Sequence, residues 1–160
     1  MRRYLSPAGD FPPASPARRL LAMTYDLLLC TALLLITTLG YTVIAMAATG
    51  EPALRQQADA GALDNSTLLT WLLGGVLLTF FTLFWCRAGQ TLGMQVWGIR
   101  VQNADGSALG IRQALWRFAL SIASWSCLGM GFAWMLVDRQ KRCWHDLGAR
   151  TLIVRLPKRR

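Results

Sequence analysis

Asp26 is the residue of this chain whose chemistry stands out, because it lies in an otherwise apolar stretch. The segment that follows it, from Leu27 to Ala48, carries no charged side chain. Such a segment can cross the hydrocarbon core of a bilayer, which is about 30 Å thick and takes about 20 helical residues. A carboxylate at the centre of a membrane helix costs roughly 2.5–3.5 kcal/mol. Asp26 lies nearer the helix start, yet it still needs a partner or a purpose.

Arg19 is the partner that the spacing suggests. It precedes Asp26 by seven residues, or two helical turns, so both side chains fall on nearly the same helix face. One interpretation is a structural ion pair, with the arginine reaching toward the headgroups. The other is a carboxylate that takes up a proton or binds a cation on a transport path. Arg19 and Asp26 are therefore candidate ion-binding or ligand-binding residues.

The composition favours a membrane protein of one domain. Of 160 residues, 54% are hydrophobic and only 16% are charged, whereas soluble domains carry about 25% charged residues. Basic residues concentrate in 1–25, 87–117 and 138–160, and acidic residues prevail in 49–66. By the positive-inside rule, this pattern predicts a multi-pass inner-membrane (plasma-membrane) protein with a cytoplasmic N-terminus. The basic residues behind the net charge of +9 are therefore expected to contact anionic lipid headgroups. We do not expect nucleic-acid binding.

The apolar blocks predict an all-α membrane protein with a small cytoplasmic β element. Residues 1–17 contain Pro12, Pro13 and Pro16 and are expected to form a flexible cytoplasmic leader. The membrane domain covers 18–156, and a basic tail covers 157–160. Its transmembrane helices are expected at about 19–48 and 67–86, the first beginning between Pro16 and Arg19 and ending before Gly50 and Pro52. Asp64, Asn65 or Ser66 can cap the second.

Two short segments have the pattern of strands. Residues 96–102 alternate, and residues 149–156 are rich in β-branched side chains. Strands near a membrane surface need partners for their backbone groups, so we expect these two to pair with each other.

A third apolar segment, about 113–137, is re-entrant, interfacial or spanning. A full crossing would place the basic tail outside and separate the two predicted strands. The sequence Gly129-Met130-Gly131 favours a break there, with both ends of the segment on the cytoplasmic side. A non-helical bend at depth requires cover by other protein.

Enzyme chemistry and bound cofactors are not expected. The four cysteines lack CxxC or CxxH spacing, and the single histidine, His145, leaves a metal site short of ligands. The glycines fit neither phosphate-binding pattern. His145 is expected to be an ordinary polar residue at the surface.

Four segments in order resemble the RDD family of membrane proteins, which is named for one arginine and two aspartates. They are RLLAMTYD (19–26), GQTLGMQVWGIRVQNADG (89–106), Arg117 and WHDLGARTLIV (144–154). The resemblance implies that Arg19, Asp26 and Asp146 are the three naming residues. It also implies supporting roles for the loop residues Gly89, Thr91 and Gly93 and for Arg117. Trp144 stands where the family usually has a leucine.

The resemblance leaves the role of Asp146 and the function open. Asp146 either bonds to backbone groups and an arginine such as Arg117 or Arg142, or lies near Asp26 as a second acid. Family members have been suggested to take part in transport, including cation/proton exchange. We therefore expect transport or exchange of a cation or small ligand through Asp26, Arg19 and Asp146. The alternative is a non-transporting assembly or interaction protein. One copy offers little room for an enclosed path, so either function implies a homo-oligomer or a membrane-protein partner.

Overall fold

The computed structural model describes residues 4–59 and 66–157. The described chain divides into two compact units, one made of residues up to 27 together with those from 80 onward, and the other of residues 28–79. The fold is mostly helical, with two apolar helices and a small two-stranded sheet.

Two helices are long and apolar enough to cross a membrane. They are α1, Pro16–Thr49, and α3, Thr67–Arg87, with mean hydropathies of 2.2 and 1.9 in their most apolar windows. Proline at the first position of α1 suits a helix start, because its missing N–H is not needed there. Ser66 caps α3, since its Oγ accepts a bond from the N–H of Leu69 at 3.4 Å. The other two candidate caps, Asp64 and Asn65, lie outside the described residues.

The acidic segment after α1 contains a helix that the sequence did not reveal. Gly50 adopts a positive φ of 81° and ends α1, as expected, but α2, Glu51–Asp59, begins directly after it. Pro52 falls in the first turn of α2, where proline is tolerated. An ion pair between Glu51 and Arg55, one helical turn apart, adds to the helix.

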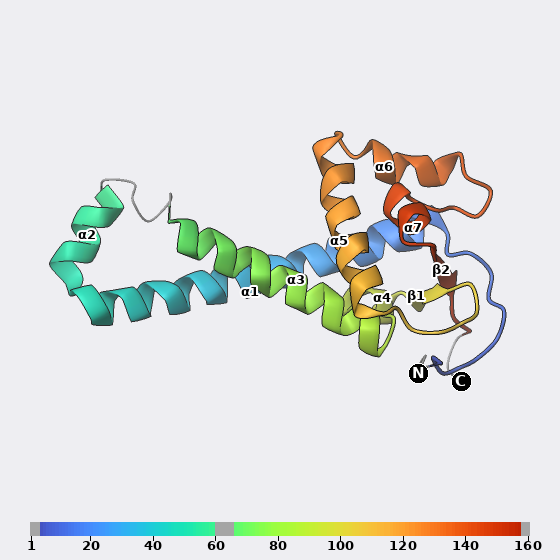
Figure 1. The fold of residues 1–160 in the computed structure, drawn as a ribbon, viewed down its shortest axis with the longest axis horizontal. Coiled ribbons are helices and arrows are strands. Elements are labelled where there is room, and N and C mark those ends of the chain that lie inside the picture. Colours follow the sequence, from blue (N-terminus) through green and yellow to red (C-terminus); the bar gives the residue numbers. More distant parts are fainter. Residues whose placement is uncertain (1–3, 60–65, 158–160) are drawn as a thin grey trace. The chain divides into compact units, whose positions relative to one another are not determined.

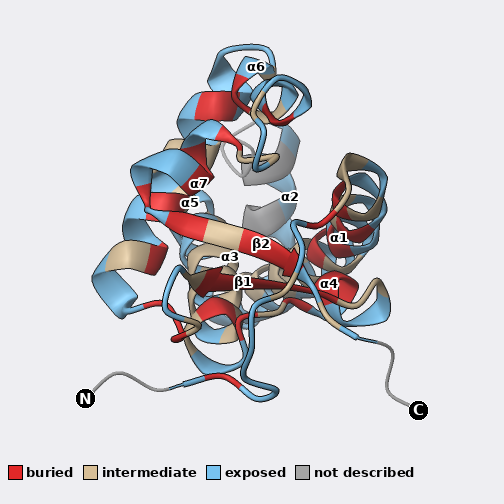
Figure 2. Ribbon diagram, turned by 90° about the vertical axis from the view of Figure 1, so that its right-hand side faces the viewer, coloured by how far each residue is buried: buried red, intermediate tan, exposed pale blue. Residues whose placement is uncertain are grey.

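The two predicted strands exist and pair with each other, as expected. They are β1, Ile99–Asn103, and β2, Thr151–Arg155, in antiparallel register with Val101 opposite Ile153. Both lie side by side in Figure 2 and are largely buried. β1 begins three residues later than expected because Leu92–Val96 forms a short helix, α4. Gly98, with a φ of 60°, then turns the chain into β1.

The leader differs from the flexible segment that its prolines suggested. The N–H of Ala14 donates to the carbonyl of Ile153 at 2.9 Å, and the N–H of Arg155 donates to the carbonyl of Pro12 at 2.9 Å. Leu5 and Ala14 are buried. Prolines prevent a helix here, but their extended conformation suits the outer edge of a sheet. The described part of the leader thus covers the free edge of β2.

The third apolar segment is bent, as the glycines predicted. It consists of α5, Ile111–Ser126, followed by α6, Met130–Ala133, and a 3-10 turn, η1, Trp134–Leu136. The axes on either side of the break differ by 107°, and Gly129 has a left-handed conformation at the bend. Figure 1 shows the chain turning away from the end of α5 into α6. After a loop, the last helix, α7, covers Trp144–Gly148.

Candidate functional site

The centre of the site is the carboxylate of Asp146, which is fully buried. Asp146 lies on α7, and its Oδ2 accepts a bond at 2.9 Å from the N–H of Cys143, the residue that precedes the helix. Such a bond caps the start of α7. The same Oδ2 also accepts from Arg19 Nη1 at 2.9 Å, and Oδ1 lies 2.5 Å from Arg117 Nη1. Asp146 therefore joins α7 to α1 and α5, and the expected pairing with Arg117 is present.

Arg19 pairs with Asp146 and not with Asp26. Its guanidinium, which is 3% exposed, donates to Asp146 through Nη1 and to the carbonyl of Ile153 through Nη2, at 3.3 Å. The predicted ion pair between Arg19 and Asp26 is therefore wrong. The two residues share a helix, but the aspartate that Arg19 meets is 127 residues away in the sequence.

Arg117 on α5 completes the ionic part of the site. Its Nη1 donates to Thr151 Oγ1 at 2.5 Å, and its Cζ lies 5.1 Å from the centre of the Trp85 ring. A guanidinium over an indole face gains a cation–π interaction, which is stronger when water is excluded. Arg117 thus connects α5 to β2 and to the end of α3.

The charges around Asp146 decide its protonation state. Burial alone would raise the pKa of this carboxyl group, but Arg117, Arg19 and the Cys143 N–H outweigh it and hold the pKa at about 2. With two arginines against one aspartate, the cluster carries one excess positive charge. The Nε atoms of Arg19 and Arg117 are both buried, and neither has a hydrogen-bond partner among the described residues. An ionised Asp146 is therefore the counterion that makes burial of these arginines tolerable.

Asp26 forms a second junction, with uncharged donors. Its Oδ2 accepts from Thr91 Oγ1 at 2.5 Å and its Oδ1 accepts from the N–H of Gly93 at 2.9 Å. Thr91 Oγ1 also accepts from the N–H of Met94 at 3.3 Å and so caps α4. Asp26 and Thr91 together satisfy the first backbone donors of this helix. The carboxylates of Asp26 and Asp146 have separate sets of donors.

Gly89 and Gly93 lie so close to neighbouring atoms that a larger side chain would not fit at either position. A Cβ on Gly93 would lie 2.8 Å from Asp26 Oδ1 and would collide with the carbonyl of Ala22. A Cβ on Gly89 would lie 2.5 Å from the carbonyl of Val101, and Gly89 also has a positive φ of 66°. Gly89, Thr91 and Gly93 therefore serve to seat the α3–α4 connection against α1 and β1.

His145 is buried, and the expectation of a surface histidine is wrong. Burial and the neighbouring Arg117 cation lower its pKa to about 3, so the imidazole is neutral at physiological pH. Within the described part of the chain its Nδ1 has no hydrogen-bond partner, and the centre of its ring lies 4.9 Å from the centre of the Phe132 ring. The sequence around His145 could not predict this burial, because the segments that cover the imidazole are distant in the sequence.

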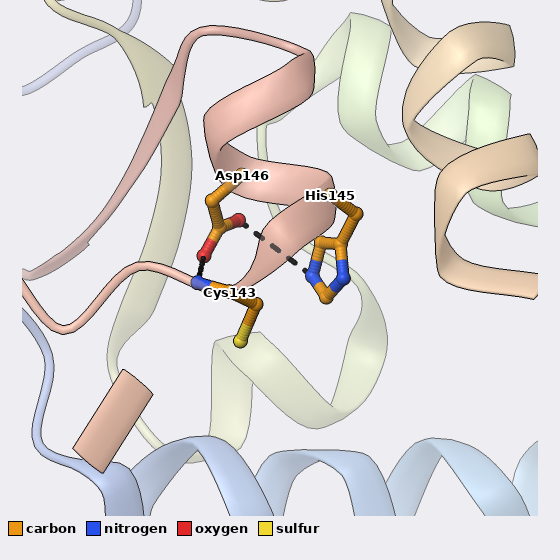
Figure 3. A group of neighbouring side chains, drawn as sticks. All are labelled: Cys143, His145 and Asp146. Atoms are coloured by element: carbon orange, nitrogen blue, oxygen red, sulfur yellow. Dashed lines mark hydrogen bonds and ion pairs between the residues drawn. The ribbon is translucent and has the colours of Figure 1, made fainter. Parts of the chain in front are cut away.

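Three groups that could bind a metal meet around α7, although the sequence offered no metal-binding spacing. Figure 3 shows Cys143, His145 and Asp146, whose ligand atoms lie within 4.8 Å of one another. A divalent cation does not fit this cluster, because both carboxylate oxygens of Asp146 already form ion pairs with the guanidinium groups of Arg19 and Arg117. Burial also raises the pKa of the Cys143 thiol to about 11, which keeps it protonated, whereas metals bind the thiolate. The trio is better explained as a helix start beside an ionic cluster.

Thr151 and the Cys143 backbone belong to the site and were not predicted. Arg100 is a further buried arginine, held by Gln102 Oε1 and the carbonyl of Pro7. The alternation of side chains in residues 96–102 predicted a strand. It could not predict that the leader covers Arg100 through Pro7 and Phe11.

The fold and site define a small helical protein with two membrane-length apolar helices and a buried arginine–aspartate cluster. A family model, described as the RDD family, matches residues 13–150. The chain therefore belongs to the RDD family, and the family and the two apolar helices together indicate a membrane protein. No curated protein and no solved structure matches the chain.

Proposed function

We propose that this RDD protein is a multi-pass inner-membrane protein with α1 and α3 as its crossings and its N-terminus in the cytoplasm. The excess of arginine and lysine in residues 1–25, 87–117 and 138–160 supports this orientation. In the proposed topology the bent third segment does not cross, which keeps both paired strands, β1 and β2, on the cytoplasmic side.

The function that the geometry supports best is that of a non-enzymatic, non-transporting assembly or interaction protein. The observation that carries it is the position of Asp146, fully buried between Arg19 and Arg117. A carboxylate with a pKa of about 2 does not exchange protons near neutral pH, and two arginines repel a cation. The arginine–aspartate cluster then joins α1, α5, α7 and β2 into a rigid unit. That unit presents the apolar helices to a membrane-protein partner or to further copies of the chain.

Transport of a cation or small ligand is the second candidate, and Asp26 is the observation that favours it. Asp26 lies within α1, and the described residues that donate hydrogen bonds to it, Thr91 and Gly93, are both uncharged. A cation could replace these donors at the carboxylate. Arg19 and Asp146 would then hold the helix in position and not bind the ion themselves.

A single comparison separates the two candidates. Purified protein is reconstituted in proteoliposomes that contain a pH-sensitive dye, and sodium, potassium or lithium pulses are applied. We expect the same small signal for the wild type and for Asp26→Asn, and we expect the wild type to co-purify with a partner at fixed stoichiometry. A cation-dependent pH change that Asp26→Asn abolishes, in a folded protein, would establish transport instead.

A further inference from the structure

Helix α5 carries apolar side chains on its outward face as well as on its inward face. The inward face combines Ala114 and Phe118, at the apolar core, with the polar side chains of Gln113, Arg117 and Ser124. Its outward face and the bend that follows carry large apolar side chains that are exposed: Ile111, Leu115, Trp116, Ile122, Trp125 and Leu128. Exposed apolar surface of this extent marks contact with lipid or with another protein. We call these six residues the α5 surface.

The bend sets the depth at which the α5 surface can lie. Leu128 at the bend is 97% exposed and adopts a positive φ of 53°, so non-helical backbone is uncovered there. Irregular backbone exposed to lipid is not found within the hydrocarbon region, because nothing there can bond its polar groups. The headgroup region provides water and phosphate for these groups. The break and the exposed bend therefore favour the boundary of the bilayer over its hydrocarbon core as the position of the bend.

The charges near this surface fit an anionic leaflet. Between residues 111 and 157 every exposed charged side chain is basic: Arg112, Arg139, Arg150 and Arg155. The two acids of this part of the chain are both neutralised by arginines, Asp138 by Arg142 and Asp146 by Arg19 and Arg117. Arg112 lies in the first turn of α5, and Arg139 follows η1. Exposed tryptophans such as Trp116 and Trp125 are also typical of the headgroup level.

We infer that the α5 surface is a binding surface for anionic lipid, lying in the cytoplasmic leaflet with Arg112 and Arg139 donating to headgroup phosphates. The inference rests on the topology proposed above, because both ends of the bent segment must lie on the same side. Helices of this kind sit with their apolar face about 5–10 Å below the headgroups. The surface thus binds lipid in one leaflet and does not form a third crossing.

Depth is measured with nitroxide labels in nanodiscs that contain anionic lipid. Cys127 at the bend is exposed and free, so it is labelled directly in a Cys86→Ala background, and Leu35→Cys in the middle of α1 is the deep reference. We expect the Cys127 label at shallow depth and the Leu35 label near the bilayer centre, judged by collisions with oxygen and with a water-soluble nickel chelate. A central depth for Cys127, or a label shielded from both reagents by a second copy, would overturn the inference.

Headgroup selectivity is measured with a spin-labelled phosphatidylglycerol in the same nanodiscs. Each arginine near the surface contributes a gain in affinity of about fivefold, so Arg112→Gln with Arg139→Gln should lower the preference for this lipid by up to about 25-fold. The matched control is Arg55→Gln, an exposed arginine on α2, which should leave the preference unchanged. An unchanged preference in the double variant would contradict the inference.

Topology labelling keeps the two proposals apart. Thiols introduced at Asp59 and Arg155 are tested with an impermeant reagent from the outside. Labelling at Arg155 would overturn the proposed topology and this inference together. Protection at Arg155 with a deep Cys127 label would overturn this inference alone.

Discussion

At the scale of single residues, two buried polar contacts of this chain connect segments that are far apart in sequence. Arg19 meets Asp146 across 127 residues, and Asp26 meets Thr91 across 65. Each pair is buried, so the loss of one partner leaves a polar or charged group without compensation. The strength of these junctions is therefore revealed by comparing single with double substitutions.

Asp146→Asn should destabilise the protein more than any other single change in the cluster, since it leaves Arg19 and Arg117 buried side by side. We expect a loss of about 3–5 kcal/mol in the free energy of unfolding, measured in detergent by denaturant titration. The double variant Arg19→Ala with Asp146→Asn should lose less than the sum of its two single variants. Additive losses would mean that the two residues are not coupled.

Arg55→Ala is the control for this comparison. Arg55 also forms an ion pair, with Glu51, but both side chains are exposed. Exposed pairs contribute at most about 1 kcal/mol, so its effect on unfolding should be small.

His145 predicts a dependence of stability on pH. Its pKa is about 3 in the folded protein, against 6.5 for an exposed histidine, so protons bind the unfolded chain more readily. Stability is complete above pH 6.5 and falls as the pH drops from 6.5 toward 3. Asp146 contributes in the same direction only from 3.8 down to about 2. His145→Gln should therefore flatten the pH profile of thermal unfolding between pH 6.5 and 4.

At the scale of elements, the packing of α4 against α1 depends on a glycine, Gly93. Gly93→Ala adds a methyl group that meets Asp26 and Ala22, and such overpacking typically costs 1–3 kcal/mol. Thermal unfolding in detergent measures this loss. Gly110→Ala is the matched control, because nothing lies within 4 Å of its added Cβ. Equal stability of the two variants would show that α4 does not pack tightly on α1.

Sequence patterns predicted the elements well where the pattern is local. Hydropathy placed α1 and α3, alternation and β-branching placed β1 and β2, and two glycines placed the bend after α5. Local patterns could not identify partners. Arg19 and Asp26 share a helix face, but the face alone does not show that Asp146 arrives there and takes the arginine. Likewise, the prolines of the leader excluded a helix without showing the sheet edge that the extended chain covers.

At the scale of the whole molecule, the described part of the leader belongs to the folded unit that contains the sheet. Deleting residues 1–11 should remove the backbone bonds at Leu5 and the contact of Phe11 with Arg100, and so leave Arg100 exposed. We expect faster cleavage near Gly106, which lies next to the leader through the bond from Leu5, when inverted vesicles are treated with protease. Substitution of Tyr4, which is exposed, by serine should leave the cleavage rate unchanged. Equal cleavage of the deletion variant and the wild type would show that the leader does not protect the sheet.

The separation of Arg19 from Asp146 also sets an order of events during synthesis. Ribosomes add about 5–20 residues per second, so roughly 6–25 s pass between the two residues. During that interval Arg19 lacks its partner Asp146, and Asp26 lacks Thr91 and Gly93 for the time that their synthesis takes. In the proposed topology α1 is therefore inserted before the chain contains the residues that hold it, and a segment made later fixes one made earlier.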